Sequence, residues 1–260
     1  SGPLPGGCVV LAYPMGEVKQ MAPSSLPSKY NRKIGRAMGD YRMLDDGDRV
    51  LVAVSGGVDS LVAAWVLHTW RAKAPIDYLL EAVYVDNGFW TPEHGGLPPA
   101  QRIAAQLERF GLSSTAVGGW SVKGERTCFL CSRNRRSQLF ELARQKGFNK
   151  IALGHHKDDL IETFMINALY SGNVSTMVPR QDLFDGRLSL IRVLAYLDKK
   201  EIIEISKLVD LEPVDSYCPI GEDSRRETVR SLLEHICTHI PDARNSIFSA
   251  LGNVRDGYML

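Results

Sequence analysis

The sequence predicts an α/β fold, a doubly wound parallel sheet, and two observations support this class. Four short apolar runs are rich in β-branched residues, as strands buried on both faces are. They cover residues 50–54, 79–85, 114–117 and 150–153. Helical patterns alternate with these runs and cover residues 61–73, 98–110 and 132–147. The crossovers are therefore expected to be right-handed, with ligands bound at the carboxyl ends of the strands.

An amino-terminal helix is expected before the first strand, over residues 28–45, with Ser28 as its cap. Its apolar residues fall on one face at helical spacing. The opposite face carries Lys29, Arg32, Lys33 and Arg36. This basic face is either a solvated surface or a patch that contacts RNA backbone phosphates rather than bases.

The chain beyond residue 158 is predicted to be mainly helical. The helical patterns cover residues 160–170, 199–208, 225–238 and 245–253. One further strand is expected over residues 188–193, after a turn at Asp185 and Gly186.

Composition and segment boundaries indicate one globular domain. The chain has 260 residues, of which 44% are hydrophobic and 23% charged. Residues 1–27 are rich in Gly, Pro and Ser, which predicts a disordered leader or an expression remnant. Residues 28–260 are expected to form a single domain, in which residues 199–260 are a helical extension.

Charge and cysteine content narrow the class of function. The formal net charge is +1, so a surface for nucleic acid must come from local clustering of basic residues. No apolar run reaches the length of a membrane span, and we expect no membrane partner. Five cysteines without a secretion signal favour a reducing, cytoplasmic compartment and a metal or redox role.

The strongest motif is SGGVDS, which directly follows the first predicted strand and precedes a helix. It comprises Ser55, Gly56, Gly57, Val58, Asp59 and Ser60. The glycines let backbone amides approach an anion, and the helix adds its positive amino end. Asp59 suits a phosphate site when Mg²⁺ lies between them. The motif lacks the lysine of a Walker A loop and resembles the PP-loop signature of enzymes that split ATP to AMP and pyrophosphate.

Two other strand ends belong to the same edge of the predicted sheet. Asp86 follows the second strand, where the adenosine part of a nucleotide would lie. Gly154 and His155 follow the fourth strand, and Asp158 and Asp159 come next. The aspartates either bind a metal or cap the following helix, and a structural role is the alternative for His155.

Three cysteines are expected in loops. Cys128 and Cys131 form a Cys-x-x-Cys pair before the helix at residues 132–147, and Cys218 lies further along the chain. Cys237, inside an apolar helical stretch, is interpreted as a small core residue. Spacing alone leaves open a structural zinc site, a redox pair, or a 4Fe–4S cluster on three thiolates.

The order of the motifs resembles the tRNA 2-thiocytidine synthetase family. The segments SGGVDS, TCFLCSRNRR and IALGHHKDDLIETFMINALYSG, then IRVLAY followed by Cys218, occur in unbroken order along almost all of residues 29–254. The resemblance implies an adenine nucleotide alpha hydrolase-like fold of the PP-loop ATPase type.

The resemblance also implies an activity in two steps. ATP adenylates the C2 carbonyl of a pyrimidine in tRNA, and sulfur then replaces the carbonyl oxygen. Cytidine in the anticodon loop is the first choice of base. It implies ATP and a 4Fe–4S cluster on Cys128, Cys131 and Cys218. From the residues themselves we expect Mg²⁺ at Asp59, and Asp59, Asp159 and Arg135 as further catalytic residues. The sulfur donor would be sulfide or persulfide derived from a cysteine desulfurase, and a homodimer is compatible with the sequence.

Val58 supports an alternative, because tRNA 2-thiouridylases share valine at this position. The competing hypotheses are therefore a uridine-thiolating enzyme, an enzyme that thiolates a small molecule, and a nucleotide-binding module with structural zinc. Basic residues flank the cysteines and are expected to bind tRNA phosphates. They are Arg133, Arg135 and Arg136, then Arg225, Arg226 and Arg230.

Overall fold

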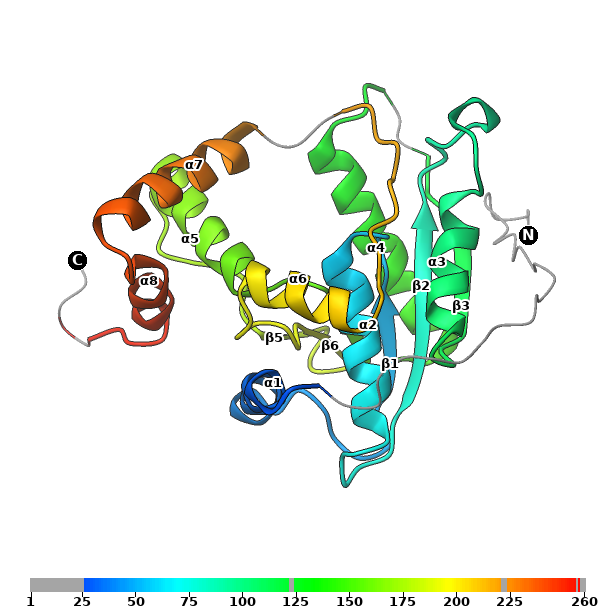
Figure 1. Ribbon diagram of the computed structural model, residues 1–260, viewed down its shortest axis with the longest axis horizontal. Helices are drawn as coiled ribbons and strands as arrows, with labels where there is room; N and C mark the ends of the chain where they lie inside the picture. The colour runs from blue at the N-terminus through cyan, green and yellow to red at the C-terminus, as the bar shows by residue number, and fades with distance from the viewer. Residues whose placement is uncertain (1–25, 122–123, 221–223, 256, 258–260) are drawn as a thin grey trace.

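The computed structural model describes residues 26–121, 124–220, 224–255 and 257. The predicted strands all form, and they lie in one six-stranded sheet (Figure 1). The strands are β1 (Arg49–Ala53), β2 (Leu79–Asp86), β3 (Ser114–Gly118), β4 (Lys150–Ala152), β5 (Arg180–Leu183) and β6 (Leu188–Ile191). Their order across the sheet is β3-β2-β1-β4-β6-β5.

β5 was not predicted, and it makes the sheet mixed rather than wholly parallel. It pairs antiparallel with β6 at the edge of the sheet, whereas the other neighbouring strands pair in parallel. The hairpin turn runs through Phe184, Asp185 and Gly186, which have φ values of 53°, 58° and 81°. β5 escaped prediction because its sequence, RQDL, is polar at three of four positions, as a partly exposed edge strand can be.

Helices connect the strands, and several begin earlier than their apolar periodicity indicates. They are α1 (Ser28–Asp40), α2 (Val58–Arg71), α3 (Pro99–Glu108), α4 (Cys128–Lys146), α5 (Lys157–Ser171), α6 (Lys199–Leu208), α7 (Ser224–His239) and α8 (Ala243–Leu251), with a 3₁₀ turn at Pro92–His94. The first turns of α2 and α5 carry polar residues such as Asp59, Ser60 and Asp158, so hydrophobic spacing does not mark them.

α1 differs from its prediction at both ends. It ends at Asp40 rather than at residue 45, and Pro27 rather than Ser28 is its N-cap residue, without a side-chain cap. Leu26, assigned to the leader, is buried in the main core. Residues 1–25, which hold the rest of that segment and Cys8, lie outside the described residues.

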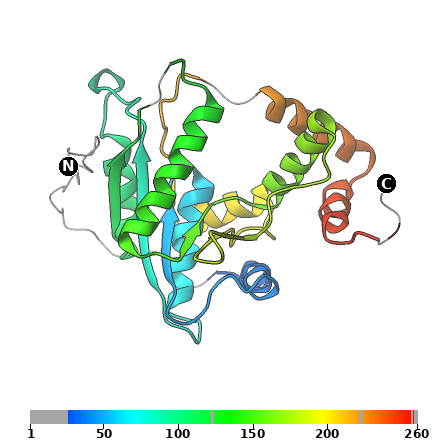
Figure 2. The same cartoon turned by 180° about the vertical axis from the view of Figure 1, so that it is seen from behind.

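The sheet is covered on both faces. Alternate residues of β1 point to opposite sides, so that Val50 and Val52 pack with α1, α2, α3 and α6. Leu51 packs on the other side with Leu139 and Leu142 of α4. Figures 1 and 2, seen from opposite sides, show α2 and α6 in front of the sheet in one view and α4 in front in the other.

α5 leads away from the sheet and carries α7 and α8. A small cluster of buried residues joins these helices, namely Ile161, Val229 and Leu233. α7 and α8 pack on α5, whereas α6 packs on α2 beside the sheet. No described helix is long and apolar enough to cross a membrane.

The strand order fixes where a ligand can bind. From central β1 the chain continues to β2 and β3 on one side, and β4 lies on the other side. The loops after β1 and β4 therefore diverge at their carboxyl ends and leave a crevice between them, which is where doubly wound sheets bind ligands.

Candidate functional site

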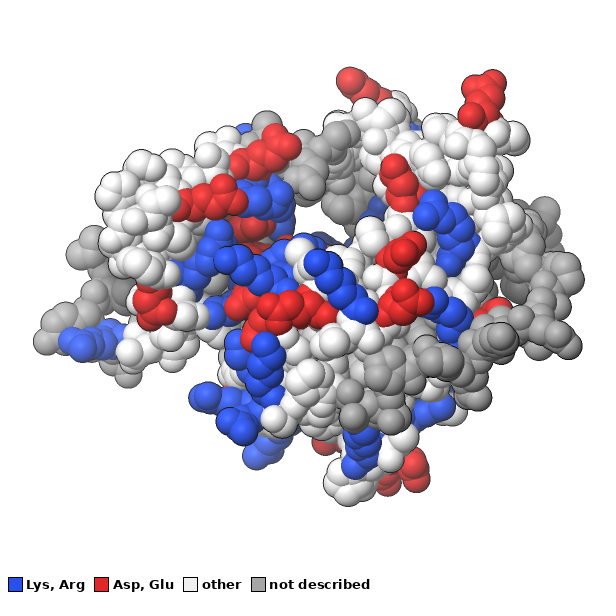
Figure 3. Space-filling model, in the orientation of Figure 1, with Lys and Arg blue, Asp and Glu red and all other residues white. Residues whose placement is uncertain are grey.

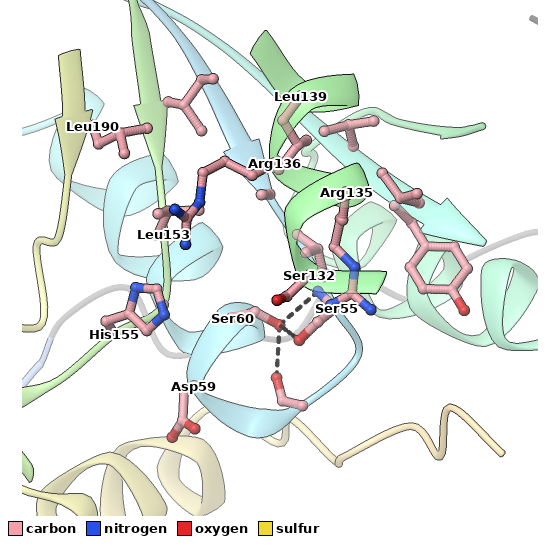
Figure 4. Close-up of a pocket in the computed structure, with 18 of the residues that line it drawn as sticks. Ser55, Asp59, Ser60, Ser132, Arg135, Arg136, Leu139, Leu153, His155 and Leu190 are labelled. Atoms are coloured by element: carbon pink, nitrogen blue, oxygen red, sulfur yellow. Dashed lines mark hydrogen bonds between the residues drawn. The ribbon is translucent and has the colours of Figure 1, made fainter. Parts of the chain in front are cut away.

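A cavity of about 320 Å³ opens at this crevice. The ends of β1, β2, β4 and β6, the first turn of α2 and residues 132–140 of α4 form its walls (Figure 4). Small-molecule sites commonly have volumes from about 300 Å³ upward. Of the predicted site residues, those that line it are Ser55, Gly57, Asp59, Ser60, Arg135, Gly154, His155 and Asp159.

The loop between β1 and α2 is held in an anion-binding form by its serines. The Oγ of Ser60 accepts a hydrogen bond from the backbone N–H of Ser55 (3.0 Å) and donates one to the carbonyl of Gly57 (2.8 Å). These two bonds tie the start of α2 to the end of β1. The amino end of α2, which stabilises negative charge, then borders the cavity.

Two predicted glycines have packing roles that the sequence did not reveal. Gly56 has φ of 91°, and a Cβ there would lie 2.9 Å from the carbonyl oxygen of Val214. Gly154 touches α2, because a Cβ there would lie 2.7 Å from the backbone nitrogen of Ser60. Both glycines let neighbouring backbones approach the loop, and Gly154 also lines the cavity.

Asp59 points toward α6, away from the arginines of α4 (Figure 4). Its carboxylate accepts hydrogen bonds from the Nζ of Lys199 at 2.6 and 2.7 Å, and His156 Nε2 lies 3.8 Å away. Lys199 is the first residue of α6, and its backbone N–H donates to Asp158 (2.8 Å). Sequence reasoning missed Lys199 because it is 140 residues from Asp59.

Three arginines supply positive charge to the cavity: Arg135, Arg136 and Arg192. Within the part of the chain that is described, the buried Nε of Arg135 has no hydrogen-bond partner. Burial, together with the nearby charge of Arg136, lowers the pKa of Arg192 to about 10, and Asp159 opposes the shift. A buried donor without an acceptor costs free energy, so the cavity favours an anionic ligand.

His155 and Asp159 form the wall opposite α4. Burial lowers the pKa of His155 to about 4, Asp159 opposes that shift, and Arg192 reinforces it. His155 is therefore a neutral side chain near pH 7. Asp159 accepts a hydrogen bond from the backbone N–H of His156 (2.9 Å) and pairs with Arg226 at 3.1 Å. Asp159 thus caps α5 and also faces the cavity.

Two other predicted residues lie beside the cavity rather than in its wall. Asp86 accepts a hydrogen bond from the backbone N–H of Gly88 (2.8 Å), so it shapes the loop after β2, whereas Asn87 and Phe89 of that loop line the cavity. Val58 packs against the main core. The side chain of Val58 thus packs the start of α2 against the core.

The Cys-x-x-Cys pair lies in a helix, not in the loop that was predicted. Cys128 and Cys131 belong to the first turn of α4, which starts early because the side chain of Thr127 accepts a hydrogen bond from the N–H of Leu130. Cys128 is exposed and Cys131 half-buried. Residues three apart lie on the same side of a helix, so both thiols belong to one face.

Cys218 lies in an irregular segment, as predicted, and is exposed. Within the described residues, no three His, Cys, Asp or Glu side chains are grouped closely enough to hold a metal ion. The loop after β2 nevertheless connects both cysteine regions. Tyr217 packs on His94, with ring centroids 4.5 Å apart, and Arg126 donates to the carbonyl of Asn87 (3.3 Å). Cys237 is half-buried in α7.

Several basic residues predicted to bind tRNA have acidic partners in the structure. Arg226 and Arg230 of α7 both pair with the buried Glu162 of α5 at 3.1 Å. On α1, Lys33 pairs with Glu201 at 2.8 Å, and Lys29 pairs with Glu204 at 3.3 Å. The arginines of α7 therefore hold that helix on α5.

Comparison with known proteins assigns the family. A family model described as a PP-loop domain matches residues 26–235. The chain belongs to the PP-loop family. Two curated relatives are named tRNA-cytidine(32) 2-sulfurtransferase: one from Syntrophotalea carbinolica is 33% identical and one from Geobacter metallireducens is 34% identical. The matches cover 89% of this chain, and 91% and 92% of the relatives. The chain thus also belongs with these proteins, as its motifs predicted.

A solved structure has the same fold. The U34-tRNA thiolase NcsA from Methanococcus maripaludis with its [4Fe-4S] cluster superimposes with a TM-score of 0.69 over 87% of this chain and 79% of that one, at 22% identity. At this identity the likeness concerns the fold alone. It confirms the expected PP-loop architecture of this chain.

Lys199 and Arg192 are the residues of this PP-loop site that sequence reasoning missed. Arg192 stands in the IRVLAY segment, directly after β6, and a charged residue there interrupts an apolar run. Lys199 follows Asp198, the N-cap of α6, whose capping box with Glu201 is visible in the sequence. The charged residue after the apolar run indicates a strand end, and the capping box indicates a helix start. Neither signal indicates which distant residue Arg192 or Lys199 contacts.

Proposed function

We propose that this chain is an ATP-dependent tRNA sulfurtransferase that replaces the C2 oxygen of a pyrimidine, cytidine in the first instance, with sulfur. Two curated relatives are named for tRNA-cytidine sulfur transfer, and this chain matches them over nearly their whole length. The cavity at the PP-loop adds the physical basis, because it offers cations and a helix amino end to a nucleotide.

One observation carries the proposal: a single face of α4 presents both the thiols and the cavity arginines. Ser132, Arg135, Arg136 and Leu139 line the cavity at helical spacing. Cys128 and Cys131 stand four residues before Ser132 and Arg135, so they continue that face toward the amino end. Four residues of helix span about 6 Å. Sulfur would thus be handled about one helical turn from the activated substrate.

ATP suits the donors of the cavity. The N–H groups at the start of α2 and the guanidinium groups of Arg135 and Arg136 would face its phosphates, and the unpartnered Nε of Arg135 would gain an acceptor. The loop at Asn87 and Phe89 would take the adenosine part. Mg²⁺ at Asp59 would require Lys199 to leave that carboxylate, and its ammonium could then pair with phosphate.

A 4Fe–4S cluster suits the donor set of Cys128, Cys131 and Cys218. When bound on three thiolates, it supplies an iron position without a protein ligand, which is open to exogenous sulfur. Cys218 would have to approach the first turn of α4 for this, since the three are not grouped as a metal site in the described structure. Its exposed segment, anchored at Val214 by a hydrogen bond to Gly56, is suited to such a movement.

The reaction needs two displacements. The C2 oxygen of the base attacks the α-phosphorus of ATP, and pyrophosphate leaves with the electron pair of the broken P–O bond. Arg135, Arg136 and Arg192 would offset the negative charge that develops on the phosphates. Sulfide (HS⁻) then attacks C2 and releases its proton to solvent. The C2–O bond breaks and AMP departs with the oxygen, so that sulfur replaces it.

The proposal is tested by nucleoside mass spectrometry of tRNA from a strain that lacks the gene. We expect one 2-thiopyrimidine to be missing and to return with the wild-type chain. Asp59→Ala should not restore it, and its pyrophosphate release should be lost. Normal tRNA in the deletion strain would contradict the proposal, whereas loss of a 2-thiouridine would correct only the base.

The cysteine assignment is tested separately, by iron and sulfide analysis after anaerobic purification. Cys128→Ala, Cys131→Ala and Cys218→Ala should each lose the broad visible absorbance of an iron–sulfur cluster. Cys237→Ala in α7 is the matched control and should retain it. Zinc near one per chain without iron would favour the structural zinc hypothesis instead.

A further inference from the structure

A second, larger hollow of about 760 Å³ lies outside the PP-loop cavity. α1, α5, α8 and the segment after α5 form its walls. We refer to it as the α1–α8 groove. Neither the proposed chemistry nor the motifs explain it, and its volume suits a group the size of a nucleotide.

The lining of the α1–α8 groove is basic and includes no acidic residue among those described. Its four cations are Arg32, Lys33, Arg36 and Lys157. Figure 3 shows Lys and Arg side chains gathered over α1. This is notable in a chain with a net charge of only +1. Cations concentrated in one hollow of a nearly neutral protein indicate an anionic ligand.

Two of these cations lack acidic partners within the described structure. Lys33 and Arg36 form ion pairs with Glu201 and Asp40, but Arg32 and Lys157 form none. Burial lowers the pKa of Lys157 and the charge of Lys33 lowers it further, whereas the carboxylates of Asp198, Asp158 and Glu201 oppose the shift. The Nζ of Lys157 also donates a hydrogen bond to the side chain of Asn245. Like charges that are held close together in a partly enclosed hollow are stabilised when an anion binds between them.

Aromatic rings form the other part of the lining. The rings of Tyr41 and Phe248 each meet that of Tyr196 edge to face, at 6.0 and 5.8 Å. Lys157 Nζ lies 5.4 Å from the centroid of Phe248, and the guanidinium of Arg36 lies 5.8 Å from that of Tyr196. Cations interleaved with aromatic rings are the arrangement by which proteins hold single-stranded nucleic acid, through phosphates and stacked bases.

The α1–α8 groove shares a wall with the PP-loop cavity. Arg192 lines the cavity and donates a hydrogen bond to the carbonyl of Val178, which lines the groove. In the first turn of α5, Lys157 lines the groove and Asp159 lines the cavity. An RNA whose target base enters the cavity would therefore bring neighbouring nucleotides toward the groove.

We propose that the α1–α8 groove binds an unpaired nucleotide of the RNA substrate, with backbone phosphates on Arg32 and Lys157 and the base stacked on the ring cluster of Tyr196 and Phe248. The inference rests on the proposed function and extends it, because it names a second contact that selects unpaired RNA. It also changes the expectation for α1 from phosphate contacts alone to a site that holds a base as well.

The test measures binding of an RNA stem–loop, and of a fully paired duplex of the same length, as a function of salt. Arg32→Glu should weaken stem–loop binding about tenfold at low salt and reduce the slope of log K against log salt by about 1. Lys73→Glu reverses an exposed charge just after α2 and is the matched control. It should leave the affinity for the stem–loop and the salt slope unchanged.

Phe248→Ala tests the stacked base. It should weaken stem–loop binding about tenfold and leave duplex binding nearly unchanged, because only an unpaired base can stack on a side chain. Phe248→Leu keeps apolar packing in α8 but removes the ring, so the same loss in this variant excludes a folding defect. ATP binding should be unaffected in every variant, since the groove is separate from the cavity.

The outcomes separate the two proposals. If the wild-type chain thiolates tRNA but Arg32→Glu and Phe248→Leu bind the stem–loop normally, the groove inference is wrong and the proposed function stands. If the wild-type chain binds neither RNA, both are wrong. Light scattering measures the oligomeric state of each variant. If the wild-type chain is a dimer, the variants are monomers and RNA binding is unchanged, a second copy of the chain occupies the groove and the RNA inference is overturned.

Discussion

The sheet with its covering helices and the helices α7 and α8 are stabilised in different ways. The sheet has a large apolar core in which Leu61, Trp65 and Ile103 are almost fully buried. The cluster between α5, α7 and α8 has three fully buried residues, with a few partly buried ones packed against it. Charged pairs supplement it: Arg226 and Arg230 with Glu162, and Arg244 with Asp158.

This difference has a functional consequence. Apolar burial does not depend on charge screening, so salt does not weaken the support of the PP-loop cavity by that route. Ion pairs between partly exposed groups weaken as salt rises, so the packing of α7 is expected to loosen at high salt. Since Arg226 also pairs with Asp159 in the cavity wall, a displacement of α7 would change the charge around the cavity.

The largest effect is expected for the sheet core. Trp65→Ala in α2 removes a side chain that is 1% exposed and should lower the free energy of unfolding by about 3–5 kcal/mol. Leu232→Ala in α7, where the side chain is 43% exposed, is the control and should change it by about 0.5 kcal/mol or less. Chemical denaturation measures the unfolding free energy of both variants. Equal losses of stability would contradict the difference in apolar burial between the two regions.

A loss of activity rather than stability is expected where the sheet meets the PP-loop. Gly154→Ala places a Cβ 2.7 Å from the nitrogen of Ser60, so the start of α2 must shift. Because small displacements of a binding loop cost about 100-fold in rate, pyrophosphate release should fall by about that factor. At Gly118 a Cβ meets nothing within 4 Å, so Gly118→Ala is the matched control. Normal turnover in Gly154→Ala would refute the packing role.

The ion pairs of α7 should respond to a smaller change. Glu162→Gln removes the carboxylate that Arg226 and Arg230 share. It should lower the free energy of unfolding by about 1–2 kcal/mol, less than for a fully buried pair because both arginines are partly exposed. Amide exchange should accelerate in α7 and α8 but not in α2. Glu141→Gln, which breaks a surface pair with Arg144, should leave exchange in every helix unchanged. Uniform acceleration would mean that the two regions unfold together.

A further effect concerns pH. Burial holds the pKa of folded His155 at about 4, below the ordinary value of 6.5, with Asp159 opposing and Arg192, Arg226 and His156 favouring the shift. As pH falls from 6.5 toward 4, the unfolded chain takes up this proton first, so the unfolding free energy should decrease and then level off. His155→Asn should flatten that part of the profile in urea denaturation. An unchanged profile would show that His155 is not the group responsible.

Local sequence was sufficient for most of the fold and for the PP-loop. Strands buried on both faces give continuous apolar runs, which is why β1, β2, β3, β4 and β6 were found. The edge strand β5 was missed because half of its surface meets water. The side chain of Thr127 caps the start of α4, whereas the apolar periodicity begins only after the cysteines and therefore predicts a loop there.

The sequence by itself determined which motifs this protein carries: the SGGVDS loop at residues 55–60, a thiol pair before the arginines of α4, and the motif order of its family. Only the tertiary structure decided their partners. Lys199 meets Asp59, and Arg192 lies between the cavity and the α1–α8 groove, because strand order and helix packing join residues far apart in the chain. Local periodicity reports which side of an element is buried, but it carries no information on which distant charge will lie opposite.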